Sequence, residues 1–209
     1  MRYITYTHAG RTGVGELEDN FVYPLHWDGR LIDLIAAGAQ PARTGEHIEA
    51  ASVKIEAPLR PSKIIAIGKN YAAHAKETGS EVPPAPLLFA KLPSAVIGQG
   101  DAITWRTSIT TEVDWEAELA VVIGRQGKDI AEADAFAYVF GYTVANDISA
   151  RDLQIRIDSQ WTRGKGLDTF CALGPSIVTR DEIADPQALT VQTTVNGVMM
   201  QDGQTADMV

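Results

Sequence analysis

The chain has 209 residues, of which 45% are hydrophobic and 22% are charged, and its net charge is −9 at pH 7. This composition predicts a folded globular protein, and the acidic balance argues against electrostatic binding to nucleic acid or to an anionic membrane. The single cysteine, Cys171, excludes an intrachain disulfide, and no apolar run approaches the ~20 residues of a membrane-spanning helix. We therefore expect a cytoplasmic location.

The N-terminal part of the chain predicts a small module without recognisable chemistry. Residues 2–7 alternate Tyr and Ile with polar residues, as a half-buried strand does, and residues 13–17 favour a second strand. Asp28-Gly29 lies between two apolar runs at 22–25 and 31–34, which predicts a β-hairpin.

Two prolines, Pro58 and Pro61, keep the next segment extended and separate the module from the remaining chain. We therefore expect a small N-terminal domain over residues 1–58 and a core domain over residues 61–209. A short buried strand is predicted at 63–67.

An alanine-rich helix is expected after this strand, with Asn70 as its cap and Gly79 at its end. His74 and Glu77 are three residues apart and share a face of that helix. Such a pair can act as a general base, because the carboxylate fixes the tautomer of the imidazole. A surface His–Glu pair without function is the alternative on spacing alone.

An acidic stretch leads into the most apolar strand of the chain. Asp114, Glu116 and Glu118 occupy every second position, which places three carboxylates on one face of a strand. The run that follows, 119–124, predicts a strand buried on both faces. Buried acids are costly unless a cation meets them, and a hard divalent cation prefers oxygen ligands. The alternative is the polar face of a half-solvated strand.

Asp147 follows the apolar run 137–145, and a capping box that starts at Ser149 predicts a helix directly after it. Because that helix has its own cap, the carboxylate of Asp147 is expected to be free for another task. Arg151 and Gln154 are three apart and present two long side chains on one helical face.

Glycines mark the last two features. Lys165 lies between Gly164 and Gly166, which let a backbone approach a ligand closely, and a desolvated lysine can stabilise an oxyanion. A flexible surface lysine is the alternative. Asn196-Gly197 predicts a hairpin between strands at 189–195 and 198–201.

Four stretches together resemble the fumarylacetoacetate hydrolase family. Their order and separations are similar to those of the family, and the resemblance runs from about residue 61 to the end of the chain. The first module resembles the small domain that many bacterial members carry ahead of the core. The stretches are residues 68–77, 114–124, 146–154 and 164–170.

The resemblance implies a β-rich α+β fold, with a mixed, rolled sheet around a divalent metal and a small N-terminal α/β domain. It implies a core that normally continues beyond Val209, so we expect the core to be incomplete at its C-terminus. It also implies a homodimer.

The resemblance further implies the roles of individual side chains. It assigns the metal to Glu116, Glu118 and Asp147, water activation to His74 and Glu77, oxyanion stabilisation to Lys165, and substrate contacts to Arg151 and Gln154.

The expected activity is that of a metal-dependent hydrolase that cleaves a C–C bond in an acylpyruvate or 1,3-diketo acid through a metal-bound enolate. Mg²⁺ is the expected ion, with Mn²⁺ or Ca²⁺ as alternatives, because a hard cation chelates two substrate oxygens and polarises the carbonyl. The same site would also serve a decarboxylase, an isomerase or a lyase of 2-oxo acids. A non-catalytic metal-binding remnant is the alternative of another class.

Overall fold

The protein is described by a computed structural model that covers residues 1–73, 79, 81–157 and 159–209. The strands are β1 Arg2–His8, β2 Arg11–Glu18, β3 Phe21–Pro24, β4 Ile48–Glu49, β5 Lys54–Ile55, β6 Ile64–Gly68, β7 Leu87–Lys91, β8 Val96–Ile97, β9 Val113–Asp114, β10 Ala117–Ile123, β11 Val139–Asp147, β12 Ser149–Ala150, β13 Cys171–Thr179, β14 Thr190–Val195 and β15 Val198–Gln204. The helices are α1 Leu31–Ala37, α3 Thr162–Lys165, a π-helix η4 Asp152–Ile157, and the 3-10 turns η1 Ala50–Ser52, η2 Pro93–Ala95, η3 Glu132–Tyr138, η5 Arg180–Glu182 and η6 Thr205–Asp207.

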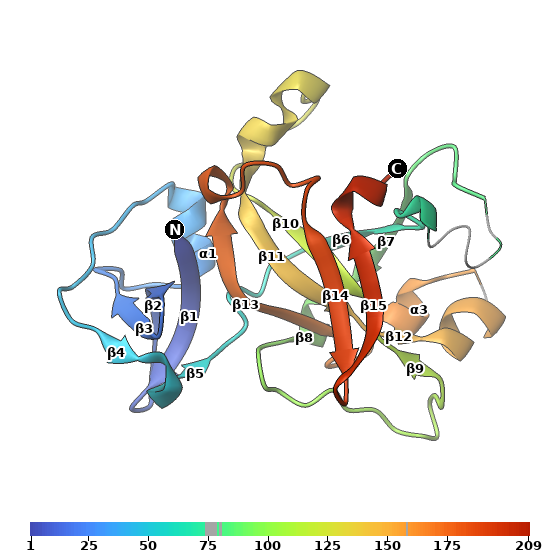
Figure 1. Ribbon diagram of the computed structural model, residues 1–209, viewed down its shortest axis with the longest axis horizontal. Coiled ribbons are helices and arrows are strands. Elements are labelled where there is room, and N and C mark those ends of the chain that lie inside the picture. The colour runs from blue at the N-terminus through green and yellow to red at the C-terminus, as the bar shows by residue number, and fades with distance from the viewer. Residues whose placement is uncertain (74–78, 80, 158) are drawn as a thin grey trace.

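A nine-stranded sheet forms the centre of the fold (Figure 1). Its main path runs β10-β11-β13-β1-β2-β3-β4, while β5 pairs with β1 and β8 pairs with β13. The β8–β13 pair is parallel and the other pairs are antiparallel, so the sheet is mixed. The predicted β-rich α+β class is confirmed.

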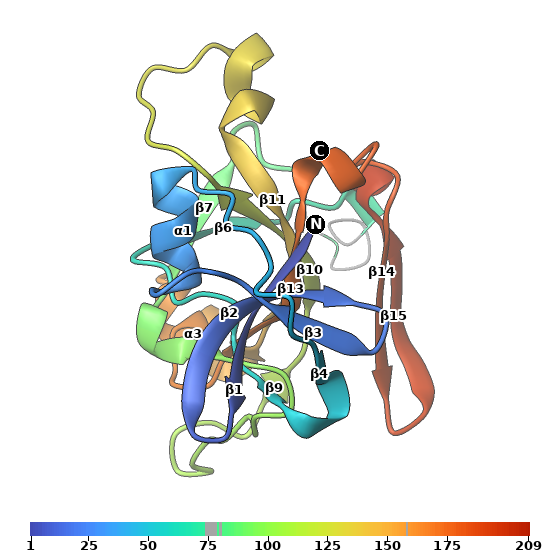
Figure 2. The same cartoon turned by 90° about the vertical axis from the view of Figure 1, so that its left-hand side faces the viewer.

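Three two-stranded sheets complete the strand pairing: β6 with β7, β9 with β12, and β14 with β15. The strand predicted at 63–67 corresponds to β6, and the hairpin predicted around Asn196-Gly197 is the β14–β15 pair. Figure 2 shows this hairpin along one side of the molecule. Within the described residues, no helix has the length and apolar character needed to cross a membrane.

The large sheet crosses the predicted domain boundary without interruption. Strand β1 pairs with β13 through Arg2↔Val178 and Tyr3↔Ile177, so the N-terminal strands and the later strands share one hydrogen-bonded array. In Figure 1 the blue N-terminal strands lie at one end of the molecule. The division into domains 1–58 and 61–209 stays a prediction.

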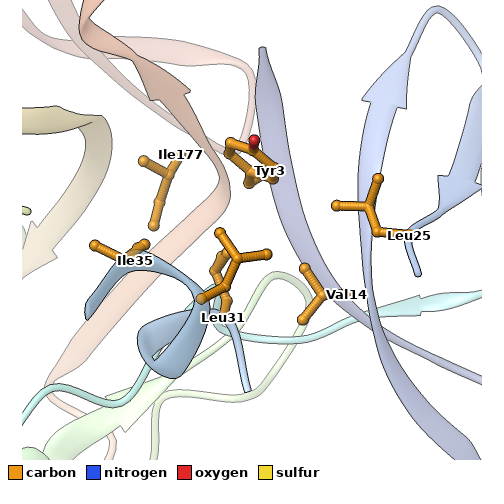
Figure 3. Packing of buried hydrophobic residues seen from close by; sticks show 7 residues of the cluster. Tyr3, Val14, Leu25, Leu31, Ile35 and Ile177 are labelled. Atoms are coloured by element: carbon orange, nitrogen blue, oxygen red, sulfur yellow. The ribbon is translucent and has the colours of Figure 1, made fainter. Parts of the chain in front are cut away.

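A core cluster fills the space between β1, β2, β13 and α1, with Tyr3, Val14 and Ile177 packed against the helix (Figure 3). The hairpin predicted around Asp28-Gly29 is wrong, because the second apolar run forms helix α1. Its buried residues are spaced three and four apart, which is the period of a helix face. They are Leu31, Leu34 and Ile35.

Strand β10 lies at the end of the sheet path and pairs with β11. Val121 is 50% exposed and Ile123 is 62% exposed, so the prediction of a strand buried on both faces is wrong here. An apolar run alone cannot show whether both faces of its strand are covered.

Candidate active site

The acidic stretch does not form one strand. Asp114 ends β9 and pairs with Ser149 of β12, whereas β10 begins at Ala117 and places Glu118 opposite Ala145 of β11. The backbone leaves one sheet and enters another between these two strands. The expectation that Asp114, Glu116 and Glu118 share the face of one strand is therefore wrong for Asp114.

Asp147 lies at the end of β11, directly beside the start of β10. Its backbone N–H donates to the Glu116 carbonyl at 2.8 Å, which fixes two acidic residues next to each other. Ser149 belongs to β12, and its Oγ donates to the Asp147 carbonyl at 2.9 Å. The predicted capping box is therefore wrong, because Ser149 is a strand residue rather than a helix cap.

Lys165 joins the two acids. Its side chain is buried, with 1% exposure, and Nζ donates to Glu116 Oε2 at 2.6 Å and to Asp147 Oδ2 at 2.9 Å. Helix α3 carries this lysine inward because Gly164 permits close packing: a Cβ there would lie 2.6 Å from the Ala150 carbonyl oxygen. The surface-lysine alternative is excluded.

A second buried ammonium, which the sequence analysis missed, contacts Asp147 from the other side. Lys91 ends β7 at 4% exposure, and its Nζ bonds Asp147 Oδ1 and donates to the Ile148 carbonyl at 3.1 Å. Burial lowers the pKa of Lys91, while Asp147 opposes this change. The carboxylate of Asp147 is thus held by two lysines rather than free. The sequence signal that could have identified Lys91 is its position as the last residue of a short apolar strand.

Glu118 lacks such neutralisation. Within the described residues, no ammonium or guanidinium group forms an ion pair with it. Burial, together with the negative charges of Glu116 and Asp147, raises the pKa of Glu118 to about 8. The Tyr71 hydroxyl is buried without a hydrogen-bond partner in the described part of the chain, and burial and the charge of Glu118 raise its pKa.

Arg151 extends the cluster toward the surface. Its Nη1 lies 2.6 Å from Glu116 Oε1 and its Nη2 lies 2.7 Å from Asp114 Oδ2. Gln154 is buried in the π-helix, and its Oε1 accepts from Arg151 Nη1 at 3.0 Å. Of the two predicted substrate contacts, Arg151 therefore pairs directly with Asp114 and Glu116, and Gln154 is joined to them through Arg151.

Five of the eight predicted site residues are linked by hydrogen bonds and ion pairs, and Glu118 joins them through electrostatic interaction. The predicted dyad of His74 and Glu77 lies outside the described residues.

The chemistry of this cluster suits a hard cation, because three carboxylates supply oxygen donors and one of them, Glu118, forms no ion pair within the described residues. Among the described residues, however, no three Asp, Glu, His or Cys side chains converge closely enough to ligate one ion. The cation between Glu116 and Asp147 in this structure is the ammonium of Lys165. The assignment of Glu116, Glu118 and Asp147 as metal ligands stays a prediction.

The fold is thus β-rich and carries a buried set of carboxylates and ammonium groups at its strand ends. Residues 63–209 match the family model of the fumarylacetoacetate (FAA) hydrolase C-terminal domain. The chain belongs to this enzyme family, which confirms the resemblance found in the sequence.

Two curated relatives show the level of similarity. The mitochondrial oxaloacetate tautomerase Fahd2a of Rattus norvegicus is 48% identical over 163 residues, which cover 78% of this chain and 52% of the relative. The oxaloacetate tautomerase YisK of Bacillus subtilis is 49% identical over 161 residues, which cover 75% of this chain and 53% of the relative. The matched residues thus span about half the length of these relatives.

Solved structures share the fold along the whole chain. The 5-carboxymethyl-2-hydroxymuconate delta-isomerase of Mycobacterium smegmatis has a TM-score of 0.84 and 36% identity, covering 100% of this chain and 77% of that one. A maleylpyruvate hydrolase of Sphingobium, solved with manganese(II) and pyruvate, has a TM-score of 0.78 and 28% identity, and the match covers 100% of this chain and 78% of the hydrolase chain. The neighbours thus include both isomerases and hydrolases.

Proposed function

We propose that this protein is a metal-dependent enzyme that interconverts the enol and keto forms of a 2-oxo dicarboxylic acid such as oxaloacetate. The observation that supports this proposal most directly is the buried Lys165 ammonium, held at 2.6 Å from Glu116 and 2.9 Å from Asp147, near the buried carboxyl of Glu118. The names of the relatives that are 48–49% identical supply the substrate class.

The proposed metal is Mg²⁺ or Mn²⁺, held by Glu116, Glu118 and Asp147. When bound, it would polarise the carbonyl oxygen of the 2-oxo acid and favour the charged enolate. A doubly charged ion would also lower the raised pKa of Glu118, because it attracts the ionised carboxylate.

The side chains of this protein would supply binding and proton transfer. Lys165 would donate to the substrate oxygen on which negative charge develops, and its buried position would strengthen that interaction. Arg151 would bind a substrate carboxylate, held in place by its hydrogen bond to Gln154. Because isomerisation removes the enol O–H proton and adds one at the adjacent carbon, we assign the proton transfer to the predicted His74–Glu77 dyad.

The test follows the ultraviolet absorbance of enol oxaloacetate with Mg²⁺ or Mn²⁺ present. The protein should accelerate the loss of the enol, and Lys165→Met should reduce the rate by about 100-fold or more, the effect expected for loss of an oxyanion donor. Lys128→Met, at an exposed lysine, serves as the matched control. A wild-type rate equal to that of metal and buffer alone would refute the tautomerase function.

C–C bond hydrolysis is the second candidate, favoured by the structural likeness to the maleylpyruvate hydrolase solved with manganese(II) and pyruvate. In this reaction the His74–Glu77 dyad would take a proton from water, the hydroxide would attack the distal carbonyl, and Lys165 would stabilise the oxyanion formed there. Collapse of this oxyanion would break the C–C bond and release a carboxylic acid and the enolate of pyruvate, which would take up the proton at carbon. Release of pyruvate from an acylpyruvate, with no isomerisation of oxaloacetate, would favour the hydrolase. Release of pyruvate from oxaloacetate would instead indicate decarboxylation.

The homodimer is also a proposal. The β6–β7 pair carries exposed apolar side chains, including Ile65 at 59% and Leu88 at 62% exposure, and such residues are common in interfaces between subunits. Sedimentation equilibrium would distinguish a dimer from a monomer.

A further inference from the structure

Strand β10 carries the predicted metal ligand Glu118, and Glu116 lies directly before its first residue, Ala117. The strand is at an edge of the large sheet, where its outer backbone groups lack a neighbouring strand. The carbonyl of Glu116 faces β11, since it accepts from the Asp147 N–H at 2.8 Å. Backbone groups alternate in direction along a strand. The N–H and C=O of the next residue, Ala117, therefore face the outer edge.

One side chain pairs with both of these groups. Gln201 of β15 accepts from the Ala117 N–H through Oε1 at 2.8 Å and donates to the Ala117 carbonyl through Nε2 at 2.9 Å. Its carboxamide thus makes the two hydrogen bonds that an adjacent strand would make. Thr193 of β14 holds this amide in place, because its Oγ1 donates to Gln201 Oε1 at 3.0 Å.

The same segment of chain also contacts the residues that precede the predicted dyad. The Val209 N–H donates to the Asn70 carbonyl at 2.9 Å, and Met208 forms a β-bridge with Tyr71. The β14–β15 hairpin and its C-terminal extension therefore connect two parts of the candidate site that are distant in sequence (Figures 1 and 2).

We propose that Gln201 is a positioning residue of the metal site. By fixing both hydrogen-bonding groups of Ala117, it sets the backbone between Glu116 and Glu118 and hence the separation of their carboxylates. Groups that orient metal ligands without touching the ion commonly affect metal affinity. The role in metal binding rests on the proposed function, whereas the fixation of Ala117 does not.

The first experiment needs no metal. Hydrogen exchange of the Ala117 amide is compared between the wild type, Gln201→Met and the control Gln192→Met. Gln192 is an exposed residue of the same hairpin that bonds Asp202 at 2.8 Å. Loss of the hydrogen bond should speed exchange of the Ala117 amide roughly tenfold in Gln201→Met only. Unchanged exchange would overturn the proposed pairing.

The second experiment titrates the same proteins with Mn²⁺ in a calorimeter, without substrate. Gln201→Met should raise the Kd for Mn²⁺ by about 10- to 100-fold, the range for residues that orient metal ligands, while Gln192→Met should leave it unchanged. If Gln201→Met binds Mn²⁺ with the Kd of the wild type, the positioning role of Gln201 is overturned, while the proposed metal site stands. A wild type that binds no Mn²⁺ would overturn the proposed metal site together with it.

Thr193→Val provides a milder variant that keeps Gln201 and removes the contact at its Oε1. If Gln201→Met fails to fold, this variant tests whether Gln201 positions the metal ligands. We expect a Kd increase of about threefold or more, because a less constrained carboxamide holds Ala117 less firmly. An affinity equal to that of the wild type would contradict the proposal.

Discussion

Asp147 is the residue on which the charged groups of the site converge, with Lys91 on one carboxylate oxygen and Lys165 on the other. Charges buried at this depth are stable only when they are paired and hydrogen-bonded, since transfer out of water costs several kcal/mol per ion. The folded arrangement around Asp147 therefore depends on both lysines.

Replacing Lys91 with methionine should lower the free energy of unfolding by about 3 kcal/mol or more, because a buried ion pair loses one partner. Urea denaturation measures this change. Lys54→Met is the control, since the exposed Lys54 pairs with Glu56 at 3.0 Å and with Asp101 at 3.2 Å, and loss of such surface pairs should change the free energy of unfolding far less. Equal effects of the two variants would show that Lys91 does not form the buried pair.

Thr110 favours the ionised form of Asp152, the residue that follows Arg151 in the chain. The Thr110 hydroxyl donates to Asp152 Oδ1 at 2.6 Å and lowers the pKa of that carboxyl, so the pair contributes stability above the unfolded pKa and loses it as pH falls through the folded one. Thr110→Val should raise the pKa of Asp152 in an NMR titration. The pKa of Asp33, which Arg30 lowers, should not move. An unchanged pKa for Asp152 would contradict this account.

Sequence reasoning identified Lys165 but not Lys91, for a physical reason. Lys165 lies between glycines, which is a local pattern, whereas the role of Lys91 depends on a contact with Asp147 across 56 positions. The raised pKa of Glu118 likewise arises only when the chain folds, because it follows from burial and from the nearby charges of Glu116 and Asp147. Residue types can suggest a site, but only the contacts in the folded structure show which acidic side chain pairs with which lysine.

At the scale of elements, strands were easier to predict than the transitions between them. β1 follows directly from alternation, and the β14–β15 hairpin follows from Asn196-Gly197. The break between β9 and β10, however, follows from pairing with two different sheets, which the spacing of Asp114, Glu116 and Glu118 does not reveal.

Helix α1 replaces the hairpin that was predicted around Asp28-Gly29, and its C-terminal end tests whether local rules explain this difference. Gly38 ends the helix with φ of 61°, and its N–H donates to the Ile35 carbonyl at 3.0 Å. Gly38→Ala should destabilise the protein by about 1 kcal/mol, because a Cβ disfavours the left-handed conformation. Gly38→Asn should cost less, since asparagine tolerates that conformation better. Urea midpoints that do not differ among the three proteins would contradict a left-handed cap.

At the scale of the whole molecule, the β1–β13 pairing makes the N-terminal strands and the core strands part of one sheet. Ile177 lies in β13 with no exposure and packs beside Tyr3 and Val14. The sheet should therefore unfold as one cooperative unit, whether or not residues 1–58 form a domain by themselves.

Ile177→Ala should lower the free energy of unfolding by about 2–5 kcal/mol, owing to the cavity it leaves. Hydrogen exchange should accelerate equally in β2 and in β11, which lie on opposite sides of β13 and β1 in the sheet. Acceleration confined to one of these strands would show two independent units.

The most direct test of the proposed site is Mn²⁺ binding by the wild type and by Glu118→Gln, measured by electron paramagnetic resonance. The wild type should bind one ion per chain, and Glu118→Gln should weaken binding about 100-fold, because the amide removes one of three anionic ligands. Glu56→Gln, at a carboxylate that pairs with Lys54 and accepts from Thr7, should bind as the wild type does. Full Mn²⁺ affinity in Glu118→Gln, or no binding in the wild type, would contradict a metal site built from Glu116, Glu118 and Asp147.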